Sequence, residues 1–191
     1  MSASMYTSDS LSWQRLRLPE EIRSIKPLYE QSFPPEERRS ASGLLSQGSH
    51  SDCHIIKIDH QNILAGFCIY WDFSEFRFVE HLATAVDLRG KGIGQSIIQR
   101  LLGLGAEAVL LEVEPPSDTI SQRRIAFYQR QGFVLLDTPY RQPSYLPGGT
   151  SLAMRIMISQ PGLSSGQLKS MIKIVHERVY EVSNGTDPQS D

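Results

Sequence analysis

The chain has 191 residues, of which 40% are hydrophobic and 21% are charged, and its formal net charge at pH 7 is −2. This length and composition can bury one core, and the charge balance gives no indication of nucleic acid binding. The longest apolar runs, such as residues 63–70, are too short to cross a bilayer. The N-terminal segment has neither the basic region nor the apolar region of a signal peptide. We therefore expect a cytoplasmic protein with no membrane or nucleic acid partner.

The first half of the chain predicts a strand, two helices and a run of three strands. Each helix is expected to begin at a proline that is followed by acidic residues, at Pro19 and at Pro35. The expected ranges are 12–18 for the first strand, 19–32 and 35–47 for the helices, and 53–59, 63–71 and 76–86 for the three strands.

The second half alternates between helices and short strands. The expected ranges are 94–102 (helix), 108–113 (strand), 119–131 (helix, capped by Gly132), 133–136 and 152–158 (strands), and 167–182 (helix). This order predicts a mixed α/β domain over residues 11–160, with a C-terminal helix within residues 161–183 packed on it. Residues 1–10 and 184–191 are polar and are expected to be disordered.

A glycine-rich turn between the third strand of the run and the next helix is the clearest chemical signal. Its sequence from position 89 to position 95 is RGKGIGQ. Glycine allows positive φ and close approach of a ligand, and the first turn of a helix offers unpaired N–H groups to an anion. The spacing fits neither a dinucleotide fingerprint, because Gln95 and Ile97 stand where glycine is required, nor a Walker A turn. The turn therefore indicates a pyrophosphate site of another kind.

Two motifs resemble those of the GNAT superfamily of acyltransferases. Arg89, Gly92 and Gly94 match its Gln/Arg-x-x-Gly-x-Gly/Ala signature, and Tyr128 with the Gly132-Phe133 pair matches its Tyr-x-x-x-Gly-Phe element. The resemblance covers roughly residues 12–158 and implies a central mixed, mostly antiparallel sheet flanked by helices, here with an extra C-terminal helix. It also implies acetyl-CoA as cosubstrate and no metal.

The resemblance assigns coenzyme A contacts to a strand edge and to the turn that follows it. The family's fourth strand pairs with the pantetheine arm, in the manner of an added strand. The implied contact residues are Leu82, Ala83, Thr84, Arg89, Gly90, Lys91, Gly92, Ile93, Gly94 and Gln95. Many family members use an asparagine after the next strand to hold coenzyme A; none matches here, and Arg123 or Arg124 is expected to replace it.

Amide formation requires a base for the ammonium group and a proton for the leaving thiolate. By resemblance, Tyr128 is the expected acid. Glu112 is the preferred base, because it interrupts an otherwise apolar strand where an unpaired carboxylate would be costly. Glu80 is its rival, since other members of the superfamily use a carboxylate on that strand, and Glu114 and His81 are further options.

Three segments are expected to border the acceptor: residues 33–39, 114–122 and 140–145. Arg38, Arg39, Tyr140 and Tyr145 belong to two of them and suit an acceptor that carries a carboxylate or planar group beside its amine. The histidines and cysteines between His50 and Cys68 lack the paired spacing of a zinc site.

These features predict an acetyl-CoA-dependent N-acetyltransferase that moves an acetyl group to a primary amine by direct attack in a ternary complex. Transfer of a longer acyl chain, acetylation of a protein or peptide amine, and a non-catalytic coenzyme A-binding regulatory module are the alternatives. A homodimer is one option by analogy with the family.

Overall fold

The computed structural model describes residues 10–146 and 148–182, which divide into two compact units. The first unit comprises the chain up to Phe73 together with Val79–Gly105, and the second comprises Ser74–Phe78 and the chain from Ala106 onward. The predicted disordered ends, 1–10 and 184–191, lie outside the described residues apart from Ser10. Helices flank strands that pair mostly in antiparallel fashion, which confirms the mixed α/β class predicted from the sequence.

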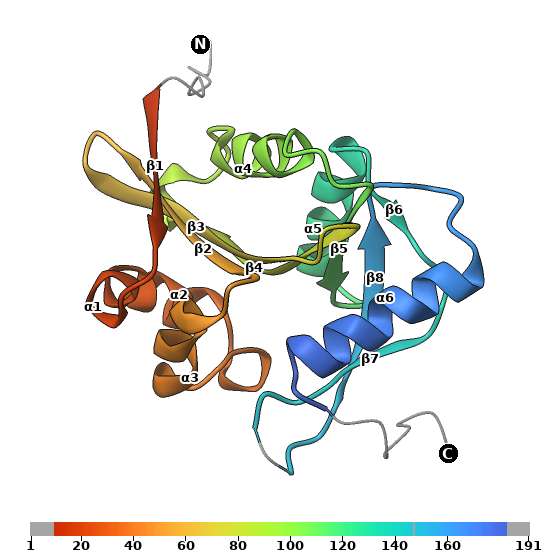
Figure 1. Ribbon diagram of the computed structural model, residues 1–191. Coiled ribbons are helices and arrows are strands. Elements are labelled where there is room, and N and C mark those ends of the chain that lie inside the picture. The colour runs from red at the N-terminus through yellow and green to blue at the C-terminus, as the bar shows by residue number, and fades with distance from the viewer. Residues whose placement is uncertain (1–9, 147, 183–191) are drawn as a thin grey trace. The chain divides into compact units, whose positions relative to one another are not determined.

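The first unit holds four strands in sequential order, with short helical stretches between β1 and β2 and after β4. Their bounds are β1 Leu11–Leu16, β2 Cys53–His60, β3 Ile63–Asp72 and β4 Phe76–Thr84, with α1 Pro19–Ile22, α2 Lys26–Ser32, α3 Ala41–Ser46, the 3-10 turn η3 Pro35–Glu37 and α4 Ile93–Leu102. Strand β4 begins in the second unit. Helices α1–α3 lie on one face of β2 and β3 and α4 lies on the other (Figure 1).

The helices on both faces of the sheet explain why β3 is apolar along most of its length. Residues from Ala65 to Trp71 are all buried, so the strand reads as a continuous apolar run instead of an alternating one. The hairpin between β2 and β3 turns at Gln61 and Asn62, whose φ values are 51° and 63°. Two successive left-handed residues give the turn type that matches the twist of antiparallel strands. The predicted hairpin is therefore confirmed.

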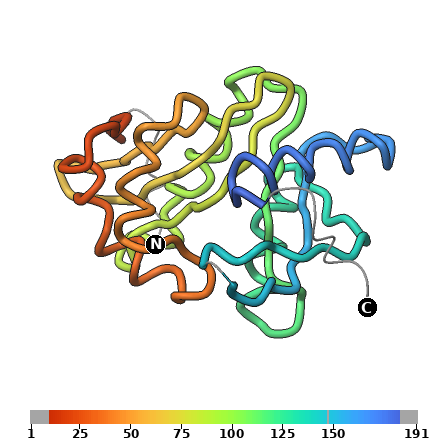
Figure 2. The backbone as a smooth tube through the Cα atoms, turned by 60° about the horizontal axis from the view of Figure 1, so that its bottom comes forward, coloured from red at the N-terminus to blue at the C-terminus, as the bar shows by residue number. Residues whose placement is uncertain are grey.

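The second unit is organised around β8. Its elements are β5 Ala108–Val113, α5 Thr119–Arg130, β6 Val134–Leu135, β7 Tyr140–Gln142, β8 Leu152–Ile158 and α6 Ser165–Arg178. Strands β5, β6 and β7 all pair with β8 in antiparallel fashion. Helices α5 and α6 lie on opposite faces of this sheet, and the chain leaves β8 through a loop to reach α6 (Figures 1 and 2).

Several boundaries differ from the sequence prediction, and four of the differences are the most informative. The second predicted helix, from Pro35, is a single 3-10 turn, and α3 begins only after Ser40, whose hydroxyl caps it by accepting the N–H of Gly43. Strand β4 ends at Thr84, because residues 86–88 form a turn. Residues 140–142, expected as loop, form β7. Helix α6 starts two residues earlier and ends four residues earlier than expected.

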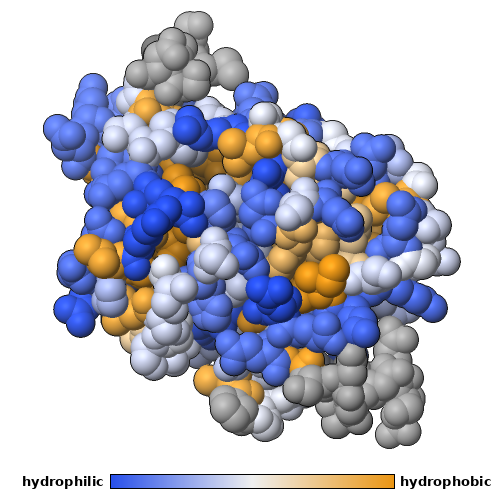
Figure 3. Space-filling model, in the orientation of Figure 1, coloured by the Kyte–Doolittle hydropathy of each residue, from blue (hydrophilic) through white to orange (hydrophobic). Residues whose placement is uncertain are grey.

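Large apolar side chains are mostly buried in the described residues. The exposed ones are single and scattered, and the face in Figure 3 mixes hydrophilic and hydrophobic residues in small groups. Among the described residues, no helix combines the length and apolar character that crossing a membrane requires.

Candidate functional site

The glycine-rich turn adopts the geometry that an anion site needs. Gly90 and Gly92 have φ values of 75° and 86°, and Gly92 is the N-cap of α4. A Cβ atom on either glycine would meet nothing within 4 Å, so the turn faces open space. No side chain caps α4. The first backbone N–H groups of α4 therefore point outward without a partner in their own helix.

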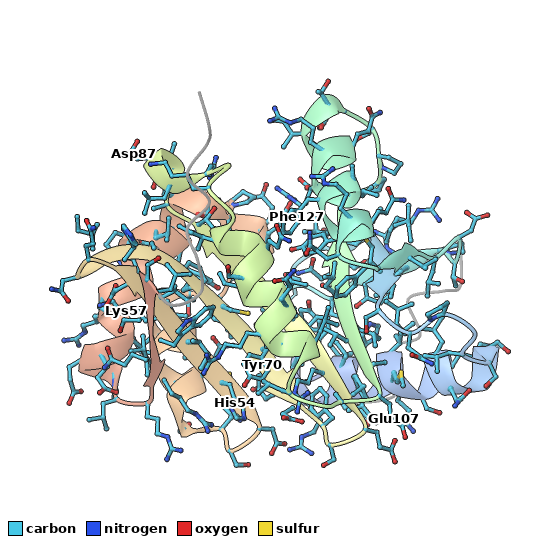
Figure 4. The ribbon with its side chains drawn as sticks, turned by 90° about the horizontal axis from the view of Figure 1, so that it is seen from above. His54, Lys57, Tyr70, Asp87, Glu107 and Phe127 are labelled. Carbon is cyan, nitrogen blue, oxygen red and sulfur yellow. The ribbon has the colours of Figure 1, made fainter. Side chains whose placement is uncertain are left out.

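Charged residues surround this turn on both sides. Arg89 is exposed and Lys91 is half-buried, and Asp87, labelled in Figure 4, lies in the 3-10 turn before them. The dipole of α4 adds positive potential at its N-terminus. The turn can therefore bind a phosphate group through backbone N–H groups and two cationic side chains.

Strand β4 approaches β3 closely just before the turn. A Cβ on Gly66 would come within 2.7 Å of the Ala83 carbonyl oxygen, and the N–H of Ala85 donates to the Ala65 carbonyl oxygen at 2.9 Å. These contacts hold the segment Leu82, Ala83 and Thr84 in extended form directly before the turn. The order of a strand end, a turn and a helix start is the one that the sequence predicted.

Glu80, on β4, lies at the centre of a buried polar cluster in the first unit. Its side chain is 0% exposed. It accepts hydrogen bonds from Arg39 Nε at 2.8 Å, Gln47 Nε2 at 2.7 Å and Trp71 Nε1 at 2.7 Å. Burial alone would raise the pKa of Glu80, but Arg39, His81 and these donors outweigh it and lower the pKa below its ordinary value. Glu80 is therefore held as an anion.

Neighbours of Glu80 tie the segment before α3 to β4. His81 Nε2 donates to the Glu37 carbonyl oxygen at 3.0 Å, and the N–H of Arg39 donates to the Tyr29 hydroxyl at 2.8 Å. Burial lowers the pKa of His81, although Glu80 opposes the shift. The contacts of Arg39 explain why residues 38–40 are extended instead of helical.

The two arginines predicted to contact the acceptor each have an acidic partner within the chain. Arg39 pairs with Glu80 at 2.8 Å, and Arg38 pairs with Glu30 at 3.3 Å. Arg124, predicted to contact coenzyme A, pairs with Glu114. Each of these contacts pairs the positive charge of an arginine with a carboxylate of the chain itself. They therefore give no support to the predicted binding of an acidic acceptor group or of coenzyme A.

Glu112, on β5, lies in a second polar cluster formed entirely within the second unit. It is half-buried and stands opposite Ile156 of β8, while Tyr140 stands opposite Met154. Residues two apart on a strand share a face, so Glu112 and Tyr140 project from the same side of β8. The Tyr140 hydroxyl donates to Glu112 Oε1, and the Tyr180 hydroxyl donates to Oε2 at 2.6 Å.

Two further side chains join this cluster. Tyr145 donates to the Tyr180 hydroxyl at 3.5 Å, and His176 Nε2 lies 3.2 Å from the Tyr140 hydroxyl. Burial first, and then the charge of Glu112, raise the pKa of Tyr140 and of Tyr180 well above the ordinary value. Both phenols therefore stay protonated and donate to the carboxylate.

The sequence predicted three members of this cluster and missed two. Glu112, Tyr140 and Tyr145 were expected near the acceptor, and the structure brings them together. His176 and Tyr180 were missed, because they lie beside the apolar stripe from which the last helix is predicted, which includes Met171, Val175 and Val179. The signal that could have found them is their i, i+4 spacing beside that stripe.

Tyr128 lies on α5 with its side chain largely buried. Its ring packs edge-on against Phe127 at 5.0 Å and tilted against Phe133 at 5.8 Å. Its carbonyl oxygen accepts the N–H of Phe133, and Gly132 takes a φ of 92° to end the helix. This turn explains the Gly-Phe pair of the motif, while the role of the Tyr128 hydroxyl stays a prediction.

A cavity of about 380 Å³ lies elsewhere in the second unit, between β6, the end of β8 and the start of α6. Val134, Asp137, Gln160 and Leu168 are among its lining residues, and none of the predicted site residues lines it. Within residues 10–146 and 148–182, no three His, Cys, Asp or Glu side chains gather in a way that could hold a metal ion.

Comparisons with known proteins agree with this architecture. The family model described as an acetyltransferase (GNAT) domain matches residues 49–135. A solved structure from Bacteroides thetaiotaomicron, described as a GNAT-family protein, is 32% identical with a TM-score of 0.81, and the match covers 90% of this chain and 99% of that one. The chain therefore belongs to the GNAT family of acetyltransferases.

More distant relatives are similar over part of the chain or in fold alone. YjbC of Bacillus subtilis (strain 168), named as an acetyltransferase, is 35% identical over 106 residues, which are 53% of this chain. The match spans about half the length of YjbC, at 52%. The ribosomal-protein-S18-alanine N-acetyltransferase of Escherichia coli is 20% identical with a TM-score of 0.59, over 81% of this chain and 96% of that one.

Proposed function

We propose that this chain transfers an acetyl group from acetyl-CoA to a primary amine by direct attack in a ternary complex. The observation that carries the proposal is the turn at Gly90–Gly92, where two left-handed glycines with open space beside them precede the uncapped start of α4, next to Arg89 and Lys91. This geometry suits the pyrophosphate of coenzyme A. The extended segment Leu82–Thr84 at the end of β4 suits backbone pairing with the pantetheine arm.

Glu112 is the proposed base for the acceptor ammonium group. Its carboxylate accepts hydrogen bonds from two neutral phenols, whereas that of Glu80 accepts one from a guanidinium. Glu80 is fully buried, and its pKa is lowered by a guanidinium partner, so it is a weak proton acceptor that substrates do not reach. Tyr128 is proposed as the acid that protonates the leaving thiolate.

The acceptor is proposed as a primary amine, with an N-terminal peptide amine as one class to assay. The Escherichia coli neighbour acts on a ribosomal protein alanine according to its name. A further neighbour of similar fold, Naa50 of Arabidopsis thaliana, was solved with the bisubstrate analogue CoA-Ac-MVNAL. Peptides therefore belong in the assay beside amino acids and polyamines.

The first experiment measures thermal unfolding with and without acetyl-CoA in the wild type and in Gly92→Val. A ligand that binds only the folded state adds about 2.7 kcal/mol at a hundredfold excess over its Kd, and we expect this in the wild type. We expect Gly92→Val to lose it, because a β-branched side chain is strained at a φ of 86° and would fill the space beside the phosphates.

Gly105→Val is the matched control. Gly105 follows α4 with a φ of 82° and open space around its Cβ position, so the substitution introduces the same strain outside the turn. Gly105→Val should lower the unfolding temperature and keep the shift by acetyl-CoA. Equal ligand shifts in the wild type and Gly92→Val would show that the turn does not hold the cosubstrate.

Thiol release from acetyl-CoA across amino acids, peptides, polyamines and other amines separates an enzyme from a binding module. Turnover with an acceptor supports the transferase. Stabilisation by acetyl-CoA without turnover on any of these acceptors would favour the regulatory module instead.

A further inference from the structure

Tyr180 reaches Glu112 from the far end of the second unit's sequence. It lies two residues after the end of α6, its side chain is buried, and its hydroxyl lies 2.6 Å from Glu112 Oε2 across 68 residues of sequence. The residues matched by the GNAT family model end at 135, so this donor lies beyond them. The carboxylate proposed as the base is thus held partly by a segment outside the matched domain.

His176 connects the same helix to the other oxygen of Glu112. Its Nε2 lies 3.2 Å from the Tyr140 hydroxyl, which itself donates to Glu112 Oε1. Its ring also contacts those of Tyr140 and Tyr180, with centroids 5.6 Å and 6.3 Å away. The residue pair His176 of α6 and Tyr180 just after the helix therefore supports one donor to the carboxylate and supplies the other.

The packing of α6 fixes where these donors point. Met171, Val175 and Val179 are buried on one stripe of the helix, and Val179 is 0% exposed. The N–H of Tyr180 donates to the Val175 carbonyl oxygen, so the backbone of Tyr180 remains tied to the last turn. A phenol held by its backbone and its packing places its hydroxyl at one position, and it orients the carboxylate that accepts from it.

We propose that Tyr180 is a positioning residue for Glu112, and that α6 is thereby part of the acetyl-transfer machinery instead of an appended packing helix. The catalytic part of this inference rests on the proposed function, in which Glu112 is the base. The hydrogen bond from Tyr180 favours the ionised carboxylate, so its loss raises the pKa of Glu112.

The test compares Tyr180→Phe with Val175→Ala. Val175 is on the same helix and is 2% exposed, so its truncation loosens α6 without removing a donor. The titratable groups around Glu112 that both variants keep are Tyr140 of β7, Tyr145 of the following loop and His176 of α6. Differences in the titration of Glu112 then report the Tyr180 hydroxyl.

Two readouts are measured in each variant. The first is the titration of the Glu112 carboxyl carbon by NMR in glutamate-labelled protein, with Glu112→Gln to assign the signal. The second is the pH dependence of kcat/KM for acetyl transfer. We expect Tyr180→Phe to move the Glu112 midpoint, and the acidic limb of kcat/KM with it, upward by about one pH unit. Val175→Ala should lower the unfolding temperature and leave both midpoints in place.

The outcomes separate this inference from the proposed function. An upward shift in both readouts supports both. A shift by NMR in a protein without turnover supports the positioning of Glu112 by Tyr180 and contradicts the transferase activity. An unmoved NMR midpoint in Tyr180→Phe, or an equal shift in Val175→Ala, overturns the inference.

Discussion

Glu80 in the first unit and Glu112 in the second both accept hydrogen bonds at both carboxylate oxygens, but from different donors. Glu80 has a guanidinium, an amide and an indole as its donors, and none of its side chain is exposed. Glu112 accepts hydrogen bonds from two neutral phenols. A buried carboxylate with a cationic partner is fixed as an anion that supports the fold, whereas neutral phenol donors hold a carboxylate less firmly in its ionised form.

The largest effect we expect concerns a tyrosine outside the Glu112 cluster. Tyr140 and Tyr180 have raised pKa values and donate to a carboxylate, which makes them poor proton donors to a thiolate. If Tyr128 is the acid, Tyr128→Phe should lower kcat by about 10²–10⁴-fold, because a general acid typically contributes that much. Steady-state kinetics measure this effect, and stabilisation by acetyl-CoA should be unchanged.

Tyr29→Phe is the control for Tyr128→Phe. Tyr29 is also buried, and its hydroxyl accepts the Arg39 N–H in the Glu80 cluster. Its substitution should reduce stability and leave kcat close to that of the wild type. An unchanged kcat in Tyr128→Phe would limit Tyr128 to its packing against Phe127 and Phe133.

Glu80→Gln should be the more destabilising of the two matched carboxylate substitutions. It leaves Arg39, whose side chain is only 15% exposed, without its anion, and breaking a buried ion pair typically costs about 3–5 kcal/mol. Glu112→Gln keeps an acceptor oxygen for one of the two phenols, removes no ion pair with a guanidinium, and should cost about 1 kcal/mol. Urea unfolding of both variants measures the difference, and equal losses would contradict the distinction between the two clusters.

The smallest effect is the acid dependence of stability. A carboxyl group whose folded pKa is lowered stabilises above its unfolded value, here 4.5, and this contribution is lost as pH falls through the folded pKa. The lowered pKa of His81 acts in the same direction, starting below 6.5. We expect unfolding free energy to fall slightly below pH 6.5 and more steeply below 4.5.

Urea midpoints measured across this pH range, in the wild type and in Glu80→Gln, check the acid dependence. The difference between the two proteins should be largest at neutral pH and should shrink as Glu80 protonates. A difference that stays constant from pH 7 to the lowest pH at which both proteins fold would show that the charge of Glu80 does not carry it.

Features set by neighbouring residues could be predicted from the sequence. The turn at Gly92 and the hairpin turn at Gln61–Asn62 both depend on the φ angles of neighbouring residues. The structure confirms both turns, with positive φ at these residues. Strand β5 followed from its apolar run, and Glu112 was visible as its interruption.

Features that depend on distant contacts could not be predicted. The bond from Tyr180 to Glu112 joins residues 68 apart, and that from Arg39 to Glu80 joins residues 41 apart. Helical periodicity gives the buried stripe of α6 but not which strand it covers, and Tyr180 lies past the end of the helix. The prediction of a long helix from Pro35 was wrong for the same reason. The ion pair between Arg39 and Glu80 joins distant parts of the chain and leaves no signal in the local sequence.

The most direct test of the distinction between the two carboxylates is thiol release from acetyl-CoA by Glu112→Gln and Glu80→Gln over a range of pH. Both proteins are first matched for folding and for stabilisation by acetyl-CoA. We predict that Glu112→Gln loses about 10²-fold or more in kcat/KM together with the pH limb that depends on a carboxylate, whereas Glu80→Gln keeps that limb. Retained turnover in Glu112→Gln, with loss of the limb in folded Glu80→Gln, would contradict the account and identify Glu80 as the base.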